Sequence, residues 1–228
     1  ELVDPAAPHG LGQLLVERFS ADDCAAYVKA YVKIDADWAT NELGKPNLPP
    51  SREVPYRAWT PRNGRLRVAT TADHTDGILT FPPEAGYPAV TTRWTLPAHA
   101  PYLDLEVTVH DKKPDPWPEA LWIALPFSVN RPEFRVGRPG SILDPAQDIV
   151  PGSNRHLFTV QTGVALFERP AGPGVGICPL DSGLVSLGQP GCWKYSIDDF
   201  PRAPSVYVNV YNNQWTTNFR LWNGGTWT

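Results

Sequence analysis

The sequence has no methionine, only three cysteines among its 228 residues, and no hydrophobic run long enough to cross a bilayer. Three cysteines are too few for a disulfide-stapled scaffold, so a packed core must hold the fold. Like charges do not cluster, and 20 Lys and Arg against 24 Asp and Glu leave a net charge of −4. Nucleic acid and anionic membrane are therefore not expected as partners. Because methionine and a secretory leader are both missing, we expect the chain to be cut from a longer product.

The cysteines leave the redox compartment open. Cys178 and Cys192 could be bridged across a loop, but buried free thiols fit this sequence better. An extracellular or periplasmic location is favoured, without a motif that decides it.

The residues that are present favour β-structure. The 26 prolines and 18 glycines argue against long helices, while 42% hydrophobic residues and 9 tryptophans support one substantial core. From Arg65 onward apolar and polar residues alternate, most clearly over Tyr102–His110, and the pattern is interrupted by turn residues. Leu121–Val129 and Val206–Tyr211 repeat it. Further strands are expected at 65–70, 90–96, 157–167 and 184–187, which together predict a large antiparallel β-sandwich over 65–228.

The first 64 residues are expected to pack on that sandwich as a helix and an extended lead-in, all within one folding unit. Ser20 and Asp23 form a capping-box pattern, followed by an apolar stripe at helical spacing that predicts one helix of about three turns. A proline-rich stretch over 44–61 then predicts a crossing loop. Glu17 and Arg18 are assigned to a surface turn or a helix end.

Several short motifs are interpreted as structural. The glycines at 172, 174 and 176 enclose Pro173 and precede no helical pattern, so they predict a hairpin turn. Asp73, His74 and Asp76 carry metal-ligand side chains but fit a polar hairpin tip better. Trp38, Trp59, Trp94 and Trp117 are expected to fill sandwich edges, and Asp198 with Asp199 to open a solvated turn.

Two stretches hold more polar chemistry than turns need. Residues 138–156 form a long connection containing Asn154, Arg155 and His156, and long connections in compact domains are often functional. Residues 207–222 alternate amides with aromatic rings, a combination that matches sugar hydroxyls and the apolar face of a pyranose. In each case a structural alternative stays open: the loop satisfies its own backbone, or the aromatics cap the core while the asparagines close a hairpin.

Four blocks carry a resemblance to a known family. They are PEALWIALPFSV (118–129), LDPAQDIVPGSNRHLFTVQTGV (143–164), PLDSGLVSLGQPG (179–191) and VNVYNNQWTTNFRLW (208–222). In sequence and order they resemble the C-terminal β-sandwich region of proteins similar to glycoside hydrolase family 38, the α-mannosidases, and a poorly characterised bacterial and fungal branch in particular. The resemblance spans essentially the whole chain, and the last block is its most specific part.

The resemblance implies a galactose-mutarotase-like super-sandwich that supports or lines the substrate cleft of a catalytic barrel absent from this chain. In the family, zinc and the nucleophile belong to that barrel, so no cofactor and no catalytic residue are expected here. The implied partners are a carbohydrate, as an oligo- or polysaccharide, and the barrel of the parent protein. The residues expected to face them are Asn154, Arg155, Tyr207, Tyr211, Trp193, Asn213, Trp215 and Asn218.

Two other functions remain possible. One is a stand-alone carbohydrate-binding module that grips polysaccharide through Tyr207, Tyr211, Trp193 and Trp215. The other is a complete mutarotase- or lyase-like enzyme, in which His110 or His156 works with Glu106 or Glu119 as a proton donor and acceptor.

Overall fold

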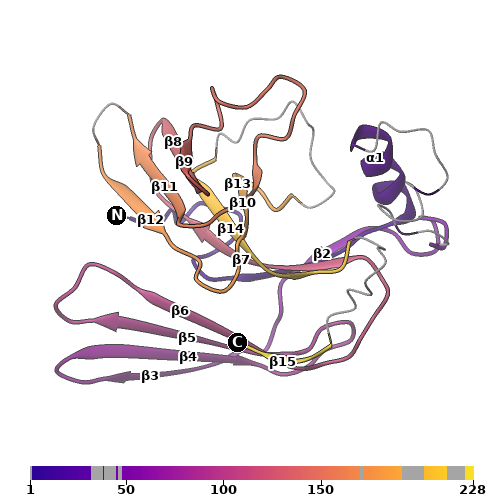
Figure 1. The fold of residues 1–228 in the computed structure, drawn as a ribbon. Helices are drawn as coiled ribbons and strands as arrows, with labels where there is room; N and C mark the ends of the chain where they lie inside the picture. Colours follow the sequence, from indigo (N-terminus) through magenta and orange to yellow (C-terminus); the bar gives the residue numbers. More distant parts are fainter. Residues whose placement is uncertain are drawn as a thin grey trace.

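The computed structural model describes residues 2–31, 38, 45, 48–169, 172–191, 203–214 and 224–228. These residues form an all-β antiparallel sandwich with one short helix near the N-terminus, which confirms the predicted fold class (Figure 1). Three sheets make up the sandwich, of six, four and five strands. No helix in the described ranges combines the length and apolar character needed to cross a bilayer.

The six-stranded sheet has the order β10-β13-β14-β7-β1-β2. Its strands are β1 (Leu14–Arg18), β2 (Arg57–Trp59), β7 (Glu119–Pro126), β10 (Leu157–Thr159), β13 (Leu184–Leu187) and β14 (Ser205–Asn212). β1 lies between β7 and β2, so the expected lead-in contributes two strands to the sandwich itself.

The other two sheets contain the remaining strands. The four-stranded sheet, β12-β11-β8-β9, contains β8 (Pro132–Arg138), β9 (Ser141–Leu143), β11 (Gly163–Glu168) and β12 (Gly174–Ile177). The five-stranded sheet, β15-β6-β5-β4-β3, contains β3 (Arg65–Thr70), β4 (His74–Phe81), β5 (Ala89–Pro97), β6 (Asp104–Lys112) and β15 (Gly225–Trp227). The single strand expected over 157–167 is wrong: it is two strands, β10 and β11, in different sheets.

Apolar residues of the six-stranded sheet are buried on both faces. One face packs against the other two sheets in a shared core that includes Val16, Val109 and Val136, one from each sheet. The opposite face carries Leu15 and Trp122 and packs against the helix. All eight residues of β7 are therefore buried, because this strand lies between two cores.

The helix α1 (Ala21–Tyr31) begins at the predicted capping box. The Ser20 hydroxyl accepts a hydrogen bond from the Asp23 amide at 3.2 Å, and the Asp23 carboxylate accepts one from the Ser20 amide at 2.8 Å. Two orphan amide donors are thereby satisfied at the helix start. Cys24, Tyr27 and Val28 turn toward the second core, as their spacing predicts.

Two short motifs are confirmed as hairpins. Gly172 and Pro173 lie in the hairpin connection between β11 and β12, where the Gly172 amide donates to the Glu168 carbonyl at 2.9 Å, whereas Gly174 and Gly176 belong to β12 and pair with β11. Of the three residues predicted at the tip between β3 and β4, Asp73 lies there, whereas His74 and Asp76 belong to β4, and Asp76 is held by Arg93 at 2.9 Å and Thr95 at 2.6 Å. No group of three potential metal ligands gathers anywhere in the described part of the chain.

The thiols differ from expectation in one case. Cys24 is free and buried, as predicted, but Cys178 is free and exposed, because it follows the end of β12. Cys192 and the Asp198 and Asp199 pair lie outside the described residues.

Candidate functional site

Four strand ends bring a group of polar side chains together at one end of the sandwich. Arg18 closes β1 and pairs in register with Glu119, which opens β7. The Asn213 amide, directly after β14, donates to the Glu119 carbonyl at 2.8 Å. Lys112 ends β6 and comes from the facing sheet. Together with Asp115 and Lys45, these residues are called the Asn213 cluster below.

Lys112 and Glu119 form a buried ion pair. Their Nζ and Oε1 atoms are 2.7 Å apart, and the side chains are only 5% and 4% exposed. Arg18 extends the pair, with its Nε 4.0 Å from Glu119 Oε2 and its Nη2 2.6 Å from Asp115 Oδ2. Burial raises the pKa of Glu119, and the hydrogen bond and charge of Lys112 oppose that rise.

Two β-bulges turn the side chains of Lys112 and Tyr211 toward the shared core. Asp111 has a left-handed φ of 47°, and the pairing of β15 with β6 shifts register there, so Lys112 leaves the solvent face that Glu106 and His110 share. The pairing of β14 with β7 shifts between Asn209 and Tyr211, which moves Tyr211 into the shared core. The Lys112 ammonium lies 5.0 Å from the Tyr211 ring centroid. Bulges of this kind turn a side chain to the face opposite the one that regular alternation predicts.

Asn213 binds the surrounding segments to one another. Its side-chain amide donates to the backbone carbonyls of Asp115 and of Trp117, the latter at 3.1 Å, and its Oδ1 accepts from Lys45 Nζ at 2.9 Å. Asn213 is only 1% exposed, so all three contacts are shielded from water. Burial lowers the pKa of Lys45. The amide therefore fixes the connection between β6 and β7 rather than facing a ligand.

A second buried carboxylate lies on the helix side of β1. Glu17 is 1% exposed and accepts from the Tyr56 hydroxyl at 2.8 Å and from Trp122 Nε1 at 2.7 Å. The assignment of Glu17 and Arg18 to a surface turn or helix end is wrong, because both belong to β1. Two adjacent charged residues are typical of a solvent-exposed segment, so the sequence did not indicate a buried strand here. The contacts of Glu17 with Tyr56 and Trp122 and of Arg18 with Asp115 show that these residues are paired.

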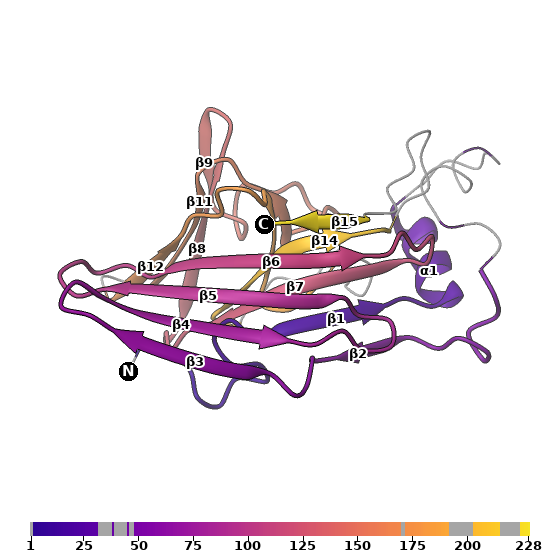
Figure 2. The ribbon, with the colours of Figure 1, turned by 90° about the horizontal axis from the view of Figure 1, so that it is seen from below.

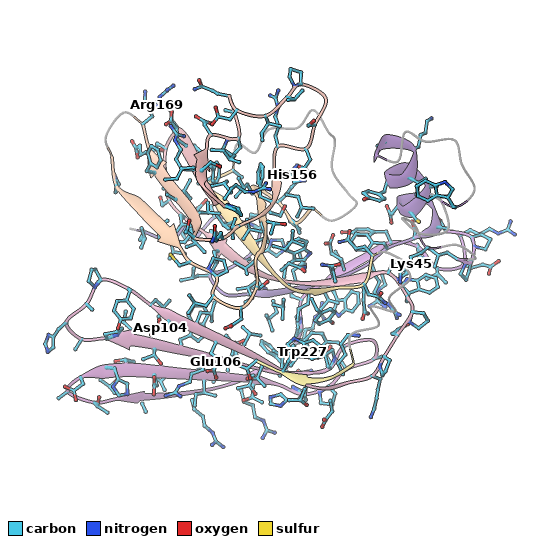
Figure 3. All side chains as sticks on the ribbon, viewed as in Figure 1. Lys45, Asp104, Glu106, His156, Arg169 and Trp227 are labelled. Atoms are coloured by element: carbon cyan, nitrogen blue, oxygen red, sulfur yellow. The ribbon has the colours of Figure 1, made fainter. Side chains whose placement is uncertain are left out.

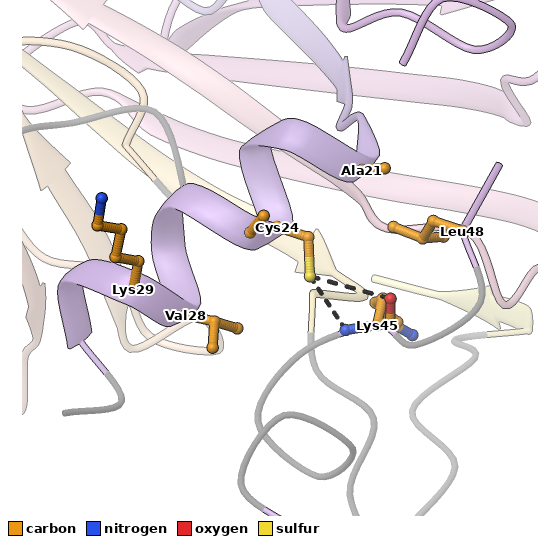
Figure 4. A pocket seen from close by; sticks show the side chains of 7 residues that line it. Ala21, Cys24, Val28, Lys29, Lys45 and Leu48 are labelled. Atoms are coloured by element: carbon orange, nitrogen blue, oxygen red, sulfur yellow. Dashed lines mark hydrogen bonds between the residues drawn. The ribbon is translucent and has the colours of Figure 1, made fainter. Parts of the chain in front are cut away.

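A pocket of about 410 Å³ opens beside the helix (Figure 4). It is lined by Ala21, Cys24, Ala25, Val28 and Lys29 of α1 and by Lys45 and Leu48. The Cys24 sulfur accepts from the Lys45 amide at 3.2 Å, and burial raises the pKa of this thiol. A protonated, buried thiol is a poor nucleophile and a poor metal ligand.

The expected ligand residues do not converge on one cleft. The Asn154 side chain closes its own turn, accepting from the His156 and Leu157 amides at 2.9 and 3.0 Å. Leu157, which the Asn154 side chain contacts, lies level with Tyr207 across β13. Asn213 follows Tyr207 by six residues, which is roughly 20 Å of extended strand. Asn154 and Asn213 are therefore far apart along the sheet. Figure 3 likewise shows His156 and Lys45, the neighbours of these two asparagines, well apart.

The remaining expected ligand residues are buried, partly buried or not described. Tyr207 is 2% exposed and Tyr211 5%, so neither ring offers a free face to a sugar, contrary to expectation. Arg155 is partly buried in the Asn154 turn. Trp193, Trp215 and Asn218 lie outside the described residues.

The acid–base candidates are also separated. His110 binds the Thr91 hydroxyl at 2.9 Å on the outer face of the five-stranded sheet, where Glu106 is exposed. Glu119 lies in the interior and is paired with Lys112. His156 is 1% exposed beside Gly191, within the six-stranded sheet region. None of these four residues lines the pocket beside the helix.

The fold is an antiparallel β-sandwich, and Arg18, Lys112, Asp115 and Glu119 of the Asn213 cluster pair with one another. No protein-family model matches the chain, and no curated protein matches it. The likeness to α-mannosidases remains a prediction from the four sequence blocks.

Proposed function

We propose that this chain is the C-terminal β-sandwich module of an α-mannosidase-like glycoside hydrolase. Its role is to support or line the substrate cleft of a catalytic barrel that is not within residues 1–228. The bond-breaking chemistry, with zinc as the implied metal, belongs to that barrel.

The observation that supports this role best is the internal pairing of the Asn213 cluster. Lys112 with Glu119 and Arg18 with Asp115 neutralise each other at the junction of two sheets. Of these two pairs, Lys112 with Glu119 is buried, and a buried, paired carboxylate is poorly placed for acid–base catalysis, which needs its groups within reach of a substrate proton. Asn213, from the most specific block of the resemblance, joins the same cluster and stabilises it.

The proposal is tested by assaying chain 1–228 on aryl α-mannosides with added zinc. We expect no turnover above buffer, and appreciable turnover that the K112M and E119Q variants abolish would contradict the support role. Polarimetry on freshly dissolved sugars checks the mutarotase alternative in the same samples. Determining the coding sequence upstream of Glu1 provides a second test, in which a β/α barrel is expected and an unrelated domain would overturn the assignment.

A further inference from the structure

β3 is an outer edge of the five-stranded sheet. Among the described strands it pairs on one side only, with β4, in an unbroken register from Arg65 opposite Thr80 to Thr70 opposite Thr75 (Figure 2). All six of its residues are exposed, and the strand contains neither a proline nor a bulge. Its outer backbone donors and acceptors thus form a regular template for another strand.

One face of β3 is apolar and uncovered. Leu66 and Val68 are 63% and 62% exposed, and the register aligns them with Leu79 and, through Gly77, with Trp94. The missing side chain at Gly77 leaves room that Leu66 partly fills, with its Cδ1 3.9 Å from the position of a Cβ there. Leu96, 52% exposed on the same face, extends this surface toward the hairpin tip. The tips of the β3–β4 and β5–β6 hairpins reach past the other two sheets (Figure 1).

The opposite face of β3 is cationic. Arg65 and Arg67 alternate with Leu66 and Val68 and so share the outer face. Neither guanidinium has a carboxylate partner in the ranges that the structure describes, whereas Arg93 on the same face is paired with Asp76 at 2.9 Å. The edge therefore presents two uncompensated positive charges beside an apolar surface.

The charges select between the possible occupants. If two copies paired through β3 about a twofold axis, Arg65 and Arg67 of each would lie opposite or diagonal to those of the other. Like charges so placed destabilise a sheet. A partner strand could instead place acidic residues beside Arg65 and Arg67 on the outer face and apolar residues beside Leu66 and Val68 on the opposite face. Both sets of contacts would then favour its binding.

We propose that β3 is a strand-addition site for another protein, whose extended segment alternates apolar and acidic residues. The apolar residues cover Leu66 and Val68, the acidic residues pair with Arg65 and Arg67, and main-chain hydrogen bonds extend the sheet by one strand. This site is independent of the mannosidase-like role and of the Asn213 cluster.

The test uses chain 1–228 and a fluorescein-labelled peptide in which glutamate and valine alternate, followed by anisotropy. We expect saturable binding that weakens with salt, and a loss of roughly tenfold or more in affinity in the double variant Arg65→Glu with Arg67→Glu. A lysine–valine peptide should bind that double variant better than it binds the wild type. Arg138→Glu, an equal charge reversal at the exposed end of β8, should change neither affinity.

Backbone pairing has its own readout. Two versions of the peptide are N-methylated at alternate positions, in opposite phases, so that each blocks one edge of the bound strand. Only one phase should abolish binding, because only one edge faces β3. The proposal is overturned if both phases bind equally, if the charge-reversed variant keeps full affinity, or if no binding occurs. A wild-type dimer that Leu66→Glu dissociates, with no peptide binding, would make the occupant a second copy and would equally overturn it.

Discussion

The Lys112 ammonium stabilises the charged form of the buried Glu119 carboxylate. Replacing Lys112 with methionine preserves most of its volume but leaves Glu119, only 4% exposed, without its closest cation. We expect Lys112→Met to lower the free energy of unfolding by about 2–4 kcal/mol at pH 7, measured by urea denaturation. Lys113→Met at the exposed neighbouring position should stay within about 0.5 kcal/mol of wild type.

The pH dependence of this variant follows from the raised pKa of Glu119. The folded state binds the Glu119 proton more tightly than the unfolded chain does, so this group lowers stability as pH rises from its ordinary pKa through the raised one. Removing Lys112 raises that pKa further. The deficit of Lys112→Met should therefore grow from acid to neutral pH, and adding Glu119→Gln should recover most of it. A deficit of equal size at pH 4 and pH 7 would contradict this account.

At the scale of single elements, two glycines with left-handed φ angles differ in the space around them. A Cβ on Gly163, at φ +128° where β11 begins, would lie 2.1 Å from the Ile177 carbonyl oxygen. Gly140, at φ +72° in the turn before β9, has no atom within 4 Å of that position. We expect Gly163→Ala to cost about 3 kcal/mol or more and Gly140→Ala about 1 kcal/mol in urea unfolding. If both variants lose the same free energy of unfolding, the strain of the left-handed backbone, and not the contact with Ile177, determines the loss.

Elements with strong local signals could be predicted from the sequence. The capping box and apolar stripe locate α1, and the strands expected at 65–70 and 184–187 have those bounds. β1 was missed because Glu17 is satisfied by Tyr56 and Trp122, residues distant in sequence. The 157–167 stretch was joined into one strand because alternation does not show that Gly163 begins a different sheet.

The candidate site was less predictable than the fold. The inward turns of Lys112 and Tyr211 depend on bulges, which reverse the side-chain phase and leave no mark in the alternation. Asn213 was predicted to face a sugar or a partner domain, but its side chain is buried and contacts Lys45 and the Asp115 and Trp117 carbonyls, which lie far from it in the chain. Asn154, by contrast, has the local Asx-type contacts that its loop composition allowed.

For the whole molecule, the shared core predicts cooperative unfolding. Val109 in the five-stranded sheet and Val136 in the four-stranded sheet are both 0% exposed in one cluster with the six-stranded sheet. Val109→Ala and Val136→Ala should each lower stability by about 2 kcal/mol and shift one common transition, followed by tryptophan fluorescence and near-ultraviolet circular dichroism. Val150→Ala, at a residue 71% exposed, provides the control. Separate transitions for the two core variants would show that the sheets unfold independently.

The position of β14 between β13 and β7 in the six-stranded sheet affects the order in which the chain folds. β14 follows β7 by about eighty residues in the chain, so the central ladder closes only after β14 has also left the ribosome. Such non-local pairing slows folding, and the open side of β7 is a site for mistaken association until β14 arrives. Recombinant yield should therefore depend on chaperones and growth temperature more than the final stability would suggest.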